Sequence, residues 1–143
     1  MNFFEIKTPR DMLNKAGREH ARLVHSIDID HVFNFFVTAY HVCDYVKVCH
    51  PGLQSAVNVL IADHDIADCR ALCANAKHLR VTKLAQPSSQ VVSNGAGAGM
   101  RGETTANAAD TWRIEIGNRT VDVRELAKRV MEKLESFFLK HSL

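Results

Sequence analysis

The chain has 143 residues, of which 46% are hydrophobic and 24% are charged, and its net charge is only +2. A chain of this length is about one domain, here residues 1–143, and it buries enough surface to fold without a disulfide or metal. The composition excludes the strong basic excess of a non-specific nucleic-acid coat protein, and no apolar run approaches the roughly 18 residues of a membrane helix.

Two helices are predicted in the N-terminal third of the chain. The first covers about residues 8–27, because Thr8 is a suitable N-cap and Pro9 suits the first helical position. The second covers about residues 28–48, because the pair Ser26 and Asp28 offers a new start. A Pro-Gly pair at 51–52 then breaks the chain.

A third helix is predicted over about residues 53–77, with a kink near Asp63, His64 and Asp65. Residues 79–84 look short and extended. Residues 86–110 contain four of the seven glycines and no aromatic residue. Such a composition buries too little apolar surface to offset the entropy of ordering, so we expect a flexible loop there.

The C-terminal part predicts a hairpin and a last helix. Apolar and polar residues alternate from Trp112 to Val121 around a Gly-Asn turn, and Asp122 then caps the helix. We interpret the mixed charges of this helix as a solvated face; the basic ones are Arg124, Lys128, Arg129 and Lys133. The predicted fold is therefore mainly α, an antiparallel four-helix bundle with a small β-hairpin insertion between its third and fourth helices.

The four cysteines are predicted to be thiols. The N-terminus MNFFEIKTPRDM lacks the basic start and apolar core of a secretory signal, so we expect a reducing, cytoplasmic location. Cys69 and Cys73 fall on the apolar side of their helix, whereas His64 and His78 fall on the opposite half. One ion could not collect all four side chains, so we expect no metal and expect Cys69 and Cys73 to be buried. We also expect no cofactor.

The second helix carries a candidate acid–base pair. His41 and Asp44 are three residues apart on its polar side, where the carboxylate can accept a hydrogen bond from the imidazole and raise its basicity. The alternative is an incidental pair on a solvated helix face.

The end of the third helix carries a candidate phosphate site. Arg70 is a fork-shaped ligand for phosphate or carboxylate, His78 can move a proton, and Asn75 can hold a ligand. Small residues between them leave room for a ligand or a partner helix. The alternative is that the basic residues at this end only complement the helix dipole.

A weaker motif is the dipeptide of His64 and Asp65. It resembles the paired His-Asp of helical metal-dependent phosphohydrolases, which also need a distant His and Asp. His20, His25 or His41 could supply the second histidine.

Three segments resemble a group of small bacterial proteins and, more remotely, the HEPN superfamily. They read FNFFVTAYHVCDYV, CRALCANAKHL and WRIEIGNRTVDVRELAKRVMEKLESF. The resemblance implies an antiparallel four-helix bundle, commonly dimeric, and in many members a metal-independent ribonuclease of defence or toxin–antitoxin systems. Their Arg and His near the end of the third helix would be Arg70 and His78, with Asn75 as an accessory residue.

Two functions follow as hypotheses. The first is a metal-free endoribonuclease in which His78 or His41 takes the proton of a ribose 2′-hydroxyl and Arg70 stabilises the phosphorane. Asp44 would orient His41, and Asn75 would position the phosphate. The second is a non-catalytic module that binds a nucleotide or a protein. In both cases we expect a homodimer, with RNA, a nucleotide or a protein as partner and no membrane.

Overall fold

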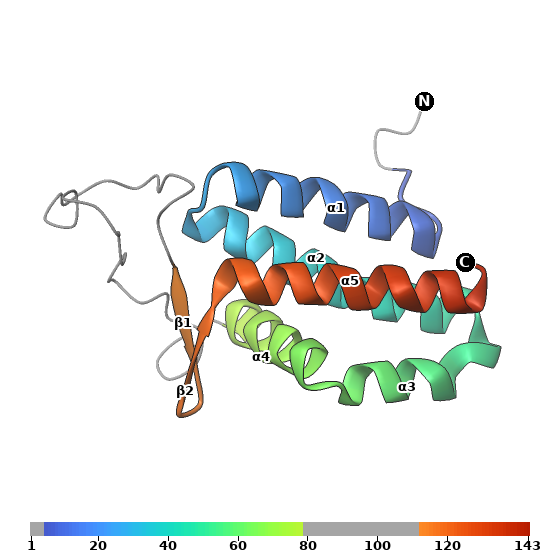
Figure 1. The fold of residues 1–143 in the computed structure, drawn as a ribbon. Helices are drawn as coiled ribbons and strands as arrows, with labels where there is room; N and C mark the ends of the chain where they lie inside the picture. Colours follow the sequence, from blue (N-terminus) through green and yellow to red (C-terminus); the bar gives the residue numbers. More distant parts are fainter. Residues whose placement is uncertain (1–4, 79–111) are drawn as a thin grey trace, which may run out of the picture.

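The computed structural model describes residues 5–78 and 112–143, without the side chains of residues 75–78 (Figure 1). The described part is mainly helical, with five α-helices, one short 3-10 helix and a small antiparallel sheet. The helices are α1 (Pro9–His25), α2 (Ile29–Cys49), η1 (Pro51–Leu53), α3 (Gln54–Ala62), α4 (His64–His78) and α5 (Val123–His141). The strands are β1 (Arg113–Ile116) and β2 (Arg119–Asp122).

Three helices begin at the predicted caps. The Thr8 hydroxyl accepts from the Asp11 amide at 3.1 Å, and the Asp11 carboxylate accepts from the Thr8 amide at 3.0 Å. This reciprocal pair satisfies two amides that have no partner inside the helix. Asp28 and Asp122 cap α2 and α5 in the same way, by accepting from backbone amides three residues later.

The third predicted helix is two helices, which corrects the expectation of one helix over residues 53–77. The chain turns at Asp63, whose ψ of 138° is extended. The Asp63 carboxylate accepts from the Asp65 amide at 2.9 Å, so it satisfies a free amide in the first turn of α4. The break falls where the sequence predicted a kink.

The predicted hairpin is confirmed. Ile114 pairs with Val121 across the two antiparallel strands, and Gly117 makes the turn with a φ of +64° that favours glycine. Ile114 and Ile116 point into the core. The predicted extended segment at 79–84 and the predicted loop at 86–110 lie outside the described residues.

The long helices pack side by side around one hydrophobic core (Figure 1). α1 and α5 run in opposite directions, because Arg10 at the start of α1 lies over the Phe138 ring, 5.1 Å from its centroid, near the end of α5. α2 and α4 also pack against each other. In the described part of the chain, no helix is both long enough and apolar enough to cross a membrane.

The core makes a first prediction with a matched pair on α2. Phe36 is 1% exposed and Phe33 is 44% exposed. We expect Phe36→Ala to lower the free energy of unfolding by about 3 to 5 kcal/mol, because it leaves a cavity. Phe33→Ala should cost less than about 1 kcal/mol. Urea denaturation measures both, and equal losses would contradict the described orientation of α2.

Candidate functional site

The predicted site residues lie on α2 and α4, two helices that pack against each other. Tyr40 and Asp44 are one turn apart on α2, and Arg70 is on α4. Burial raises the pKa of the Tyr40 phenol; the charge of Arg70 opposes this rise and that of Asp44 adds to it. Both charged groups therefore act on one ring. We call the surface formed by Tyr40, Asp44 and Arg70 the α2–α4 seam.

The cation of the seam, Arg70, is exposed and is not paired with a carboxylate of the described residues. Arg70 and Asp44 are exposed and Tyr40 is half-buried. Within the described residues Arg70 forms no ion pair with a carboxylate, so its guanidinium remains available to an anion. A guanidinium with its fork of N–H donors suits a phosphate or a carboxylate.

His41 lies beside the seam on α2 but has a different partner from the predicted one. Its Nδ1 donates to the backbone carbonyl of Val37, at 2.6 Å, and this bond sets the tautomer of the neutral ring. A bond between His41 and Asp44 is not among the hydrogen bonds of the described side chains. The carbonyl one turn earlier is a competing acceptor within reach of the ring. Nε2 is left as the nitrogen that can accept a proton.

The other two predicted residues lie in the last turn of α4. The helix continues without a break to His78, so it does not unwind between Arg70 and His78. At 1.5 Å per residue their α-carbons are about 12 Å apart. The side chains of Asn75 and His78 lie outside the described residues.

The cysteines between α2 and α4 are structural. All four cysteines are reduced thiols; Cys69 and Cys73 are buried as predicted, and Cys43 is buried as well. The Cys69 thiol donates to the carbonyl of Phe36 at 3.2 Å. Burial raises the pKa of Cys43 to about 12 and that of Cys69 well above its ordinary value. A thiol with so high a pKa carries little thiolate at neutral pH, so these two cysteines do not offer a ready nucleophile.

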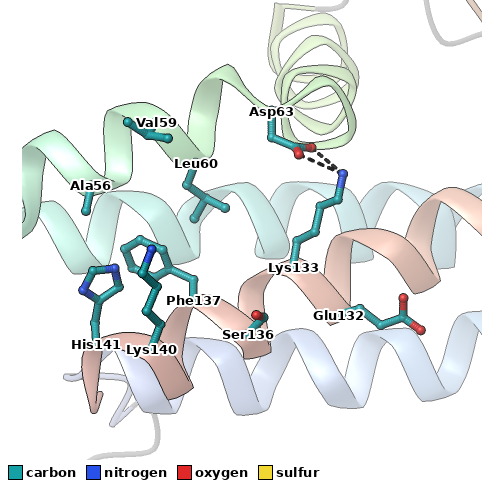
Figure 2. Close-up of a pocket in the computed structure, with 10 residues that line it drawn as sticks. All are labelled: Ala56, Val59, Leu60, Asp63, Glu132, Lys133, Ser136, Phe137, Lys140 and His141. Carbon is teal, nitrogen blue, oxygen red and sulfur yellow. Dashed lines mark hydrogen bonds and ion pairs between the residues drawn. The ribbon is translucent and has the colours of Figure 1, made fainter.

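A second polar cluster, which the sequence analysis missed, joins α4 to α5. The Lys133 ammonium lies 2.8 Å from both carboxylate oxygens of Asp63 and 2.6 Å from Asp65. Figure 2 shows this ammonium pointing at the Asp63 carboxylate across the groove between α3 and α5. Arg129 Nε lies 3.2 Å from the same Asp65, whose side chain is only 1% exposed. We call these four residues the α4–α5 charge cluster.

The charges of this cluster balance. Burial raises the pKa of Asp65, but the hydrogen bonds and charges of Lys133 and Arg129 outweigh it and leave that pKa below its ordinary value. The pKa of Asp63 is lowered in the same way, whereas the two carboxylates raise the pKa of Lys133 against the effect of burial. The pKa shifts of Asp63, Asp65 and Lys133 all favour the ionised forms, so the cluster holds helices together by ion pairs.

This cluster corrects the interpretation of the mixed charges of α5 as a solvated face for two of the four basic residues. Arg129 and Lys133 reach across to α4, and Arg119 of β2 likewise pairs with Asp68 at 2.6 Å. The sequence signal that could have revealed these ion pairs is the run of acidic residues Asp63, Asp65 and Asp68. Asp65 and Asp68 fall on the buried side of α4, and buried carboxylates require cationic partners.

The structure gives the weak metal hypothesis no support. His64 is exposed and lies 3.5 Å from Asp65, but the oxygens of Asp65 already bind two cationic side chains. Among the residues that the structure describes, no group of three or more His, Cys, Asp or Glu side chains is placed to hold a metal ion.

Comparison with known proteins adds no assignment: no family model, curated protein or solved structure matches the chain. The function must therefore be inferred from the two polar clusters. The α4–α5 charge cluster satisfies its own charges. The α2–α4 seam presents a guanidinium, a phenol and a carboxylate to solvent, so it is the better candidate for a ligand site.

The charge cluster makes a prediction about stability. We expect Asp65→Asn to lower the free energy of unfolding at pH 7 by about 2 kcal/mol or more, because both cations lose a buried charged acceptor. Glu132→Gln is the matched control on the rim of the same groove, since this carboxylate is exposed. It should change stability by less than about 0.5 kcal/mol. Equal losses in urea titrations would show that the cluster does not stabilise the fold.

Comparing the native chain with Asp65→Asn also predicts how the stability of the fold depends on pH. Because folding lowers the pKa of Asp65 below its ordinary value of 3.8, the unfolded chain takes up the proton first as the pH falls. The stabilisation is therefore full above pH 3.8 and declines below it. The difference in unfolding free energy between the native chain and Asp65→Asn should shrink as the pH falls below that value. A difference that stays constant down to pH 2.5, roughly the lower end of this range, would contradict the ion pairing.

Proposed function

We propose that the chain is a HEPN-like domain that binds RNA at the α2–α4 seam and cleaves it without a metal ion. The observation that carries the proposal is the exposed Arg70 guanidinium near the Tyr40 ring, on which the charge of Asp44 also acts. The cations of the charge cluster are committed to carboxylates, whereas Arg70 is open to the phosphate of a ligand. Arginine is well suited to that role because its fork matches two phosphate oxygens.

The proposed reaction needs one base and one cation. His41 Nε2 or His78 takes the proton of a ribose 2′-hydroxyl, and the oxygen attacks the adjacent phosphorus. Arg70 stabilises the negative charge of the phosphorane, and Asn75 holds the phosphate. The bond to the 5′-oxygen then breaks, and that oxygen takes a proton from a protonated imidazole or from water. The products are a 2′,3′-cyclic phosphate and a 5′-hydroxyl.

The proposed architecture is an antiparallel four-helix bundle in which α3 and α4 together form one broken arm. This interpretation is supported by the break at Asp63, which lets the arm bend while α4 remains packed on α2. The reduced cysteines are consistent with the proposed cytoplasmic location.

One observation favours a second function, binding of a nucleotide or a protein without cleavage. Arg70 and His78 are eight positions apart on an unbroken helix, so their α-carbons are about 12 Å apart. This distance suits two contacts to a long ligand better than two contacts to one phosphate.

Cleavage and binding can be tested on the same variants. We expect purified protein to cleave single-stranded RNA in the presence of a chelator and to leave 2′,3′-cyclic phosphate ends. Arg70→Ala should lower the cleavage rate by about 100-fold or more, because the developing charge loses its cation. Lys128→Ala, which removes an exposed cation of α5, is the control and should keep the full rate.

The outcomes separate the two functions. Intact RNA that is bound by the native chain and released by Arg70→Ala would establish the binding module and exclude the ribonuclease. Cleavage that survives in Arg70→Ala would come from another site or a contaminant, and it would overturn the proposal.

A further inference from the structure

Phe33 of α2 is an aromatic side chain that the fold leaves in solvent. It is 44% exposed, and among the described residues it is the only exposed Phe, Tyr or Trp. The side chains one turn away on the same helix are also apolar. Ile29 is 48% exposed, and Val37 is half-buried. A continuous apolar stripe of this kind marks an interaction surface more often than a single exposed side chain does.

This stripe is continuous with the α2–α4 seam. Tyr40 follows Phe33 by seven residues, which turn a helix by about 700°, so the two rings lie within about 20° of one line along α2. Asp44, eleven residues after Phe33, lies within about 20° of the same line. At 1.5 Å per residue the α-carbons of Phe33 and Tyr40 are about 10 Å apart. Phe33 therefore extends the candidate ligand site toward the start of α2.

Helix α4 follows the same direction. It packs against α2 and runs back toward the start of α2 (Figure 1). A path from Tyr40 to Phe33 therefore leads away from Arg70 and toward the end of α4. Ala74, one turn after Arg70, is exposed and carries only a methyl group, so this part of α4 leaves room for a ligand. The result is one row with a cation near Tyr40 and an exposed ring about 10 Å further along.

We propose that Phe33 is a base-stacking platform of the α2–α4 seam, and that the ligand is a single strand of RNA several nucleotides long. The inference rests on the proposed function and adds a second point of contact to it. Arg70 holds a phosphate while a base further along the strand lies on the Phe33 ring. At about 3.4 Å per stacked nucleotide, about three nucleotides cover the distance between the two contacts.

The chemistry of the row favours a nucleic acid over a protein partner. A strand of RNA alternates phosphates with flat bases, and the row offers a guanidinium for the first and an aromatic ring for the second. Every base has a face that can stack on an aromatic ring, but only an unpaired strand can present that face. A protein partner would require apolar area and not a flat ring.

The test measures binding of a single-stranded oligoadenylate in which every 2′-hydroxyl is methylated. No free 2′-hydroxyl can then attack a phosphate, so fluorescence anisotropy follows binding to the full-length chain without cleavage. Phe33→Leu should raise the dissociation constant about tenfold, because leucine has no flat face, whereas Phe33→Trp should bind as tightly as the native chain. Leu139→Ala, at an exposed apolar position on α5, is the control and should leave the dissociation constant unchanged.

Removing bases from the strand tests the stacking itself. Strands that lack one base, at each position in turn, should include one that binds the native chain about tenfold more weakly. Phe33→Leu should be insensitive to the loss of that base, because the ring that contacts it is already gone. Phe33 is exposed, so circular dichroism should show the same helix content in both Phe33 variants.

The outcomes separate this inference from the proposed function. A strand that the native chain binds, that Arg70→Ala releases and that Phe33→Leu binds normally would overturn the platform and leave RNA binding in place. A native chain that does not bind the strand would overturn both. Equal losses of affinity in Phe33→Leu and Phe33→Trp would overturn the platform too, because a stacking site accepts either aromatic ring.

Discussion

A buried carboxylate needs cationic partners, and this need of Asp65 determines how the helices around it are oriented. Its oxygens contact Lys133 and Arg129, which fixes the side of α4 that faces α5. Five residues turn a helix by about 140°, so directing Asp65 toward α5 turns Arg70 away from α5 and toward α2. The placement of the candidate ligand site therefore depends on an ion-pair cluster that takes no part in it.

The two polar clusters differ in whether their charged side chains already form ion pairs. In the α4–α5 charge cluster each carboxylate already contacts a cation, and the lowered pKa values of Asp63 and Asp65 show that ionised forms are preferred there. At the α2–α4 seam the charges of Arg70 and Asp44 act on the Tyr40 phenol only through space. A ligand gains more from the second arrangement, because binding there does not require breaking an existing ion pair.

Local chemistry explains which parts of this structure are predictable from the sequence. The caps at Thr8 and Asp122 and the turn at Gly117 each depend on atoms within about four residues, and all three are as predicted. The break after α3 depends on Asp63, which caps α4 while also binding Lys133, 70 residues away. No periodicity reveals such a contact.

Candidate chemistry was harder to predict than the helices. Spacing allowed His41 to bond Asp44, but the carbonyl of Val37 offers a nearer acceptor on the same helix. Helical spacing predicts which side chains are close enough to meet, but it does not predict which of two competing acceptors the imidazole ring will bond.

The burial of the cysteines, in contrast, was predictable, because the apolar face of the helix alone indicated that Cys69 and Cys73 are buried. Cys49 is the exposed cysteine. An alkylating reagent in water should thus modify it first, and capture of the other three would report each opening of the interface between α2 and α4.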